Sequence, residues 1–166
     1  QVIAWAEELG KLYGRGHIAL IAKDPSDYRD VMIEGQESGI LACSPPWFRP
    51  HWEPSLRRLT WPNGVIATCY SSETPDDLRG PQHHKAWVDE PAKWKHAADT
   101  WAQLQLGLRL GTSPQTLLTG TPRPIPILLA ILADEDTVVT RGKTSENKAN
   151  RSARSLKTIY TQYEGT

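Results

Sequence analysis

Two adjacent carboxylates at the end of a short apolar run are the residues of this sequence best suited to chemistry. The run 85–88 leads directly into Asp89 and Glu90, and a segment with helical spacing follows. A strand in the middle of a parallel sheet delivers side chains in this way to the carboxyl edge, where open α/β folds bind ligands. The first acid can hold Mg²⁺ through its water, and the second can orient or deprotonate an attacking water. An Asp-Glu pair is also a common helix start, so the pair alone leaves both interpretations open.

A second short strand ends in small polar residues about thirty positions further along the chain. Its last residues are Leu118 and Thr119, and Gly120, Thr121 and Pro122 follow. Because parallel strands end at the same edge of a sheet, we expect these residues beside the two acids. A hydroxyl there can sense a γ-phosphate or the attacking water and pass that state to the next element. The plainer alternative is an ordinary Thr/Gly/Pro turn that leaves a strand.

The third candidate is an arginine in the loop that precedes the acidic strand. Arg79 stands before Gly80, ten residues ahead of Asp89. An arginine at such a place can reach a phosphate in its own subunit or in a neighbour and stabilise developing charge. A solvated loop arginine is the competing interpretation.

The elements expected to position these residues alternate between helix and strand. Asn63-Gly64 between two β-prone runs predicts a hairpin, and Asp24 caps a helix that Pro25 opens. We expect the range 44–54, rich in proline and aromatics, to be a surface loop. The expected helices are 2–13, 25–34, 94–108, 127–132 and 156–163, and the expected strands are 17–22, 40–42, 56–61, 65–71, 85–88, 115–119 and 137–140. This alternation predicts an α/β fold, a mostly parallel sheet flanked by helices on both faces.

The bulk composition narrows the class of protein. The 166 residues suffice for one domain, and an apolar content of 39% permits a packed core. Nineteen basic and nineteen acidic residues cancel, so contact with nucleic acid would need local patches. Cys43 and Cys69 predict two free thiols in a reducing, cytoplasmic setting. The longest apolar stretch, 125–133, is too short to span a bilayer, and no signal peptide is recognisable.

A phosphate-binding loop is missing from the sequence. The glycine-rich range 10–16 fails the pattern Gly-x-x-x-x-Gly-Lys-Ser/Thr, since its Lys11 precedes the later glycines and no Ser or Thr follows it. It also leads from a helix into a strand, which is the reverse of the required order. Both chain ends look cut, so we expect a fragment whose phosphate-binding loop precedes Gln1.

Taken in order, the motifs resemble those of one family. They are 18–22 (IALIA), 27–32 (DYRDVM), 39–41 (GIL), 44–47 (SPPW), 59–64 (LTWPNG), 78–83 (LRGPQH), 87–90 (WVDE) and 119–124 (TGTPRP). The chain is similar to the ATPase domain of the large terminase subunit of tailed bacteriophages and prophages, the motor that packages DNA into procapsids. The resemblance covers nearly all of 1–166 as a partial, single ATPase domain. It implies a P-loop NTPase core of the ASCE or RecA-like type, with an inserted β-hairpin and an N-terminal truncation.

The resemblance also implies roles for particular residues. Asp89 and Glu90 match a Walker B pair, with Asp89 at the metal and Glu90 as the catalytic acid. Thr119, Gly120 and Thr121 match the coupling motif, in contact with the nucleotide. Arg79 matches a family arginine that acts across the subunit ring. Pro91 directly after the pair is a departure from the family pattern, and the nuclease domain is absent.

ATP and Mg²⁺ are the ligands that the resemblance implies, with hydrolysis driving double-stranded DNA into procapsids. The implied partners are double-stranded DNA, the portal protein, the small terminase subunit and further copies in a homo-oligomeric ring. The implied location is the cytoplasm of the bacterial host, without a membrane. The intact protein would be the enzyme, and the fragment alone is expected to be inactive. Two alternatives stay open: another ASCE NTPase such as a helicase-like translocase, or a non-catalytic prophage remnant or interaction domain.

The remaining candidates have plainer interpretations. His83 and His84 are expected at the surface, because adjacent side chains on a strand point apart. The seven tryptophans are expected to be core and loop anchors, with Trp47 and Trp52 in the proline-rich loop as the exceptions to watch. The range 141–157 has six basic residues and one acid, which predicts a solvated face or a DNA-facing patch.

Overall fold

The computed structural model describes residues 1–142 of the chain. The contacts divide the chain into two units, Gln1–Leu129 and Ala130–Thr166, and the sheet lies in the first. Within the described residues, no helix combines the length and the apolar character needed to cross a membrane. The predicted helix 156–163 and most of the basic range 141–157 lie outside the described residues.

A six-stranded mixed sheet, in the order β2-β3-β4-β1-β5-β6, organises the first unit. The central strand β1 pairs in parallel with β4 and β5, and β5 pairs in parallel with β6. Antiparallel pairing joins β3 to both β4 and β2. The bounds are β1 Gly16–Ala22, β2 His51–Glu53, β3 Arg58–Thr60, β4 Val65–Ser71, β5 Lys85–Asp89 and β6 Gln115–Thr119. The α/β class is confirmed, and so is the parallel pairing of the two strands that carry the candidate residues.

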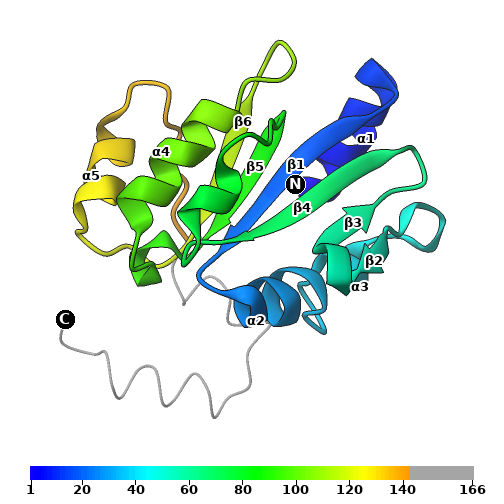
Figure 1. The fold of residues 1–166 in the computed structure, drawn as a ribbon, viewed down its shortest axis with the longest axis horizontal. Helices are drawn as coiled ribbons and strands as arrows, with labels where there is room; N and C mark the ends of the chain where they lie inside the picture. Colours follow the sequence, from blue (N-terminus) through cyan, green and yellow to red (C-terminus); the bar gives the residue numbers. More distant parts are fainter. Residues whose placement is uncertain (143–166) are drawn as a thin grey trace. The chain divides into compact units, whose positions relative to one another are not determined.

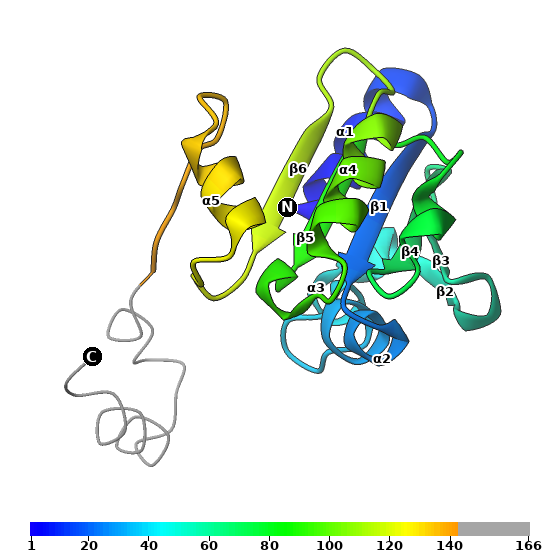
Figure 2. The ribbon, with the colours of Figure 1, turned by 60° about the vertical axis from the view of Figure 1, so that its left-hand side comes forward.

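The helices α1 (Val2–Tyr13) and α4 (Ala97–Gly107) pack against opposite faces of this sheet, as Figures 1 and 2 show. One apolar core joins α1 to the β1 side chains Ile18 and Leu20, and another joins Leu104 of α4 to Ile21 and Val88. Successive strand residues face opposite sides of a sheet. The odd-numbered residues of β5, 85, 87 and 89, therefore share the α1 face.

The predicted hairpin is confirmed, and its turn also holds α1. Asn63 Nδ2 donates to the carbonyl oxygen of Ala6 over 2.8 Å, while its Oδ1 accepts from the backbone N–H of Val65 over 3.2 Å. Gly64 has φ 83°, a left-handed conformation that glycine adopts without strain. A Cβ on Gly10 of α1 would lie 2.0 Å from Asn63 Nδ2, so α1 needs a glycine where the turn packs against it.

The second predicted helix is confirmed at both ends, and its body departs from α geometry. Asp24 Oδ1 accepts from the backbone N–H groups of Ser26 and Asp27 over 3.0 and 3.1 Å, which caps α2 (Pro25–Asp27). A π-helical turn, Tyr28–Ile33, continues it and ends before Gly35.

Four details of the predicted pattern are wrong. The range 40–42 is part of a short helix, α3 (Ile40–Cys43), and not a strand. The loop 44–54 contains strand β2, which extends the antiparallel edge. The range 137–140 forms no strand. The long helix after the acids starts at Ala97 rather than at 94, after a 3₁₀ turn at Pro91–Lys93, and it ends at Gly107 as expected. The helix predicted at 127–132 is present as α5 (Pro126–Ala133).

Candidate functional site

The ends of β5 and β6 bring Asp89 and Thr119 together, as the sequence predicts. The two residues are partners in the parallel register. Thr119 Oγ1 donates a hydrogen bond of 2.7 Å to Asp89 Oδ1. The pairing continues one residue further, since the backbone N–H of Glu90 donates to the carbonyl oxygen of Thr119 over 2.8 Å.

Glu90 is held in the same way by the next hydroxyl residue. The backbone N–H of Thr121 lies 3.3 Å from Glu90 Oε2, and Thr121 Oγ1 lies 3.2 Å from Oε1. Glu90 has φ 48° and ψ 51°, a left-handed conformation that costs a residue with a Cβ roughly 1 kcal/mol. Strain of this kind persists where the surroundings fix it, and the Thr121 contacts and the following Pro91 are two such restraints. The two adjacent carboxylates are thereby held by different residues, Asp89 by Thr119 and Glu90 by Thr121.

Gly120 allows the two strand ends to approach. A Cβ at this position would lie 3.3 Å from the Cα of Glu90 and 3.5 Å from Cδ of Pro91. Both neighbours belong to backbone or to a proline ring, so neither yields easily. The segment 119–121 therefore places two hydroxyls on the two acids, and the small residue between them packs on Glu90.

Two tryptophans are connected to Asp89, Trp94 directly and Trp87 through Thr119, and sequence reasoning assigned neither to the site. Trp87 Nε1 donates to Thr119 Oγ1 over 2.7 Å, and Trp94 Nε1 donates to the backbone carbonyl of Asp89 over 3.1 Å. Trp87 packs against the core on the α1 face, and Trp94 packs against the core on the α4 face. The spacing of Trp87 two residues before Asp89 is a sequence signal for a shared strand face.

The electrostatics of Asp89 reflect its half-buried position. Burial raises the pKa of its carboxyl above the usual value, and the nearby charges of Glu90 and Asp27 act in the same direction. The hydrogen bond from Thr119 and the charge of Lys93 lower the pKa of Asp89 in opposition. The net effect is a raised pKa for Asp89, because burial outweighs the hydrogen bond from Thr119.

Arg79 is not brought to the acid pair. Its Nε forms a 3.0 Å ion pair with Asp76 Oδ1, and both side chains are largely exposed. The segment 78–81 lies against Gly107 at the C-terminal end of α4, where a Cβ would meet the carbonyl oxygens of Pro81 and Leu78. Since α4 begins after Glu90 and ends at Gly107, Arg79 lies towards the far end of that helix from the acids.

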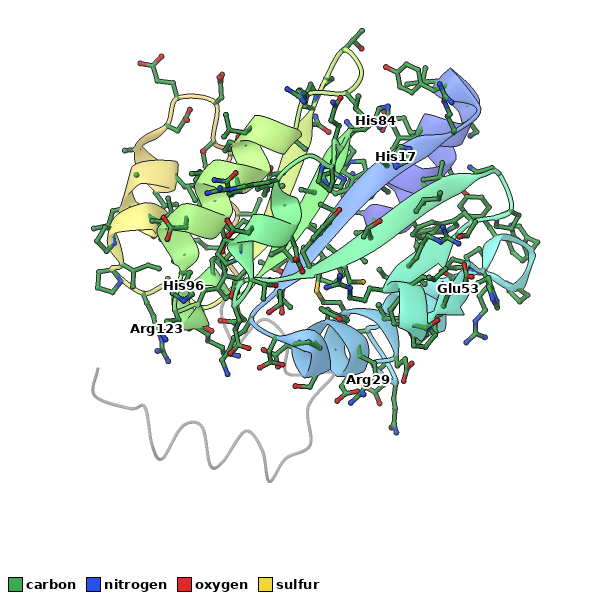
Figure 3. The ribbon with its side chains drawn as sticks, viewed as in Figure 1. His17, Arg29, Glu53, His84, His96 and Arg123 are labelled. Carbon is green, nitrogen blue, oxygen red and sulfur yellow. The ribbon has the colours of Figure 1, made fainter. Side chains whose placement is uncertain are left out.

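Three histidines, His17, His83 and His84, gather at the opposite edge of the sheet. Figure 3 shows His17 and His84 together at the start of β1, with His96 and Arg123 at the other edge. The prediction of a surface pair is wrong for His83, which is 3% exposed with neither ring nitrogen hydrogen-bonded in the described structure. Burial lowers the pKa of His83 to about 4.

The fold and the site define an open α/β protein with an acid pair at the carboxyl edge of two parallel strands, faced by hydroxyls of the neighbouring strand. Residues 3–163 match the family model described as "Terminase large subunit, T4likevirus-type, N-terminal". The match covers nearly the whole chain, and the chain belongs to this family. The resemblance seen in the sequence is confirmed, and the family gives the chain a role in phage DNA packaging, with DNA and packaging proteins as partners in general. No curated protein matches the chain.

Proposed function

We propose that this chain contributes the hydrolytic acids of a Mg²⁺-dependent ATPase that drives double-stranded DNA into phage procapsids. One observation carries the proposal: Asp89 and Glu90 are adjacent, yet each is bound by a different threonine at the end of β6. Separate restraints give two neighbouring acids separate orientations, which a metal-directed acid and a water-directed acid require.

The residues present suit Mg²⁺ by the chemistry of their donors. The cluster offers carboxylate and hydroxyl oxygens, the ligand type that Mg²⁺ prefers. No group of three or more His, Cys, Asp or Glu side chains able to hold a metal occurs in residues 1–142. A Mg²⁺ that keeps its waters and binds substrate phosphates needs only one or two carboxylates, and Asp89 would supply one. When bound, Mg²⁺ neutralises charge that develops on the phosphates.

Glu90 would act on water. A carboxylate can accept a proton from a water that attacks a phosphoryl group, or orient that water. Thr121 contacts both carboxylate oxygens through one hydroxyl and one amide, so it would fix the direction in which Glu90 accepts. Thr119 would orient Asp89 through a single hydroxyl bond to Oδ1.

The orientation of α1 also supports a nucleotide near Asp89. Helix α1 ends at Tyr13 and packs against β1, which begins three residues later at Gly16 and is parallel to β5. The helix therefore runs antiparallel to β5, and its N-terminal end is directed towards the edge that carries Asp89. Helix N-termini favour phosphate groups through their free N–H groups and dipole.

Two finer roles belong to the same proposal. Arg79 would act on the nucleotide of a neighbouring subunit in a homo-oligomeric ring, because within its own chain it lies apart from the acids. The portal protein and the small terminase subunit would be the packaging partners, with double-stranded DNA as the cargo.

The second candidate function is a non-catalytic remnant or interaction domain. A full-length gene that encodes no Gly-x-x-x-x-Gly-Lys-Ser/Thr pattern would favour it. The family match favours a packaging role over a helicase-like translocase.

Phosphate release by the full-length gene product distinguishes the ATPase from the non-catalytic remnant. It is measured with ATP and Mg²⁺, with ATP and EDTA, and with and without double-stranded DNA. We expect hydrolysis that requires Mg²⁺ and rises with DNA. A purified, folded, full-length protein that neither binds nor hydrolyses ATP would support the remnant.

A further inference from the structure

A chain of two hydrogen bonds connects an indole to the carboxylate of Asp89. Trp87 Nε1 donates to Thr119 Oγ1 over 2.7 Å, and the same Oγ1 donates to Asp89 Oδ1 over 2.7 Å. The indole bond is at the short end of the range for an N–H donor, the hydroxyl bond has the ordinary length for an O–H donor, and hydrogen bonds in series strengthen one another. The indole and the carboxylate are thus linked through one hydroxyl.

The chemistry of the donors gives this chain a direction. An indole N–H can only donate, and a threonine hydroxyl has one proton and two acceptor lone pairs. Oγ1 of Thr119 therefore accepts from Trp87 and has one proton left to give. Two acceptors lie within reach, Asp89 Oδ1 at 2.7 Å and the carbonyl oxygen of Val88 at 3.5 Å. The indole anchors the hydroxyl in the position from which the shorter bond is made.

A buried indole can also take a nearby acceptor merely to satisfy its own N–H. This chain shows that such satisfaction is not obligatory, because the indole N–H of Trp61 is buried without a partner in the described structure. Trp87 is the less buried of the two, yet its indole makes a short bond to the one hydroxyl that contacts Asp89.

We infer that Trp87 is a positioning residue, which holds the Thr119 hydroxyl as a donor to Asp89 and so orients that carboxylate towards the Mg²⁺ of a bound nucleotide. The inference rests on the proposed function, since it assigns Asp89 to the metal. The packing of Trp87 on the α1 face supplies the fixed anchor, and the parallel register of β5 and β6 supplies the alignment. Without the indole N–H, the hydroxyl can turn towards the Val88 carbonyl and Asp89 loses its restraint.

The test compares ATP binding with Mg²⁺ and with EDTA in the full-length gene product. Trp87→Phe removes the N–H and keeps an aromatic ring, and the matched control Trp61→Phe removes an N–H that has no partner among residues 1–142. For Trp87→Phe we expect the affinity for Mg²⁺-ATP to fall roughly 3- to 10-fold, with metal-free ATP bound as before. A general structural defect would weaken both forms of ATP. Trp61→Phe should leave the ratio of the two affinities unchanged.

The role of Thr119 as intermediary is tested by a double-mutant cycle on the same affinity ratio. Thr119→Val should reproduce the loss, Thr119→Ser should restore most of it, and Trp87→Phe should add little in the Thr119→Val background. If the two losses multiply instead, Trp87 does not act through the hydroxyl and the inference fails. Should Trp87→Phe not fold, benzothienylalanine at position 87 replaces the N–H by sulfur in a ring of the same size.

The wild-type protein distinguishes failure of the inference from failure of the proposed function. Wild-type binding of ATP that is indifferent to Mg²⁺ would overturn the assignment of Asp89 and with it the inference. Mg²⁺-dependent wild-type binding that Trp87→Phe leaves intact would overturn the inference alone.

Discussion

Thr121 contacts both carboxylate oxygens of Glu90, with its backbone N–H 3.3 Å from Oε2 and its Oγ1 3.2 Å from Oε1. The two residues are 31 positions apart in the chain and meet because β5 and β6 end together. A carboxylate engaged at both oxygens has its accepting direction fixed by the end of the neighbouring strand. Movement of that strand end would therefore move the acid proposed to activate water.

The Thr121 contact predicts a selective effect on turnover. Thr121→Val removes the hydroxyl and keeps the backbone N–H, so Glu90 keeps one restraint and loses the other. We expect kcat for ATP to fall roughly 3- to 10-fold with little change in nucleotide affinity. Thr121→Ser, which keeps the hydroxyl, should remain near the wild-type rate. Steady-state phosphate release together with equilibrium ATP binding measures both quantities, and an equal loss in Thr121→Ser would exclude the hydroxyl as the cause.

Arg79 is predicted to act in trans. Its ion pair with Asp76 is exposed and is worth at most about 1 kcal/mol, so a neighbouring phosphate can compete for the guanidinium. Arg79→Ala should lower the ATPase of the assembled motor by roughly 10³-fold and leave nucleotide affinity nearly intact. The exposed Arg49, changed to Ala, is the matched control.

Mixed assemblies distinguish action in trans from action in cis. An Arg79→Ala subunit keeps its own Glu90 and can receive an arginine from an adjacent Glu90→Gln subunit. Partial recovery of ATPase on mixing the two variants is the expected result. Demonstrated co-assembly without recovery would assign Arg79 to its own subunit or to structure alone.

His83 predicts a loss of stability on mild acidification. Its pKa of about 4 in the folded chain lies below the usual value of 6.5, because burial disfavours the imidazolium. Between those two pH values the unfolded chain binds a proton that the folded chain excludes. The free energy of unfolding should therefore fall as pH drops below 6.5, by up to about 3 kcal/mol near pH 4.

Urea unfolding at pH 7.5, 6 and 5 measures this dependence. His83→Leu should flatten it, and the exposed control His51→Leu should keep the slope of the wild type. An unchanged pH dependence in His83→Leu would show that other groups are responsible.

Local chemistry made several parts of the fold predictable. The Asp24 cap, the Asn63-Gly64 turn and the helical spacing of α1 each depend on residues close in sequence, and each is present. The meeting of Asp89 with Thr119 was also predictable, because parallel strands end at a common edge whatever their separation in the chain.

Long-range packing decided what the sequence left open. A short apolar run such as 40–42 has no periodicity to separate strand from helix, and packing makes it α3. Strand β2 has only three residues in a proline-rich segment, and its partner β3 decides its conformation. The burial of His83 follows from the pairing of its backbone with Gly107 and Leu110. The residues next to His83 in the sequence give no sign of this pairing.

The sequence predicts only part of the bond from Trp87 to Thr119. The spacing of Trp87 and Asp89 places both on one strand face, but the acceptor for the indole comes from another strand. Only the register of β5 against β6 identifies that acceptor.

The assignment of Glu90 is tested most directly by single-turnover ATP hydrolysis in the full-length gene product, measured beside ATP affinity. The amide of Glu90→Gln cannot accept a proton from water. This variant should therefore bind ATP like the wild type and hydrolyse it at least about 100-fold more slowly. Asp89→Asn should weaken Mg²⁺-ATP binding instead, and the exposed control Glu37→Gln should change neither quantity. A Glu90→Gln protein that hydrolyses ATP at the wild-type rate would contradict the proposed function of the acid pair.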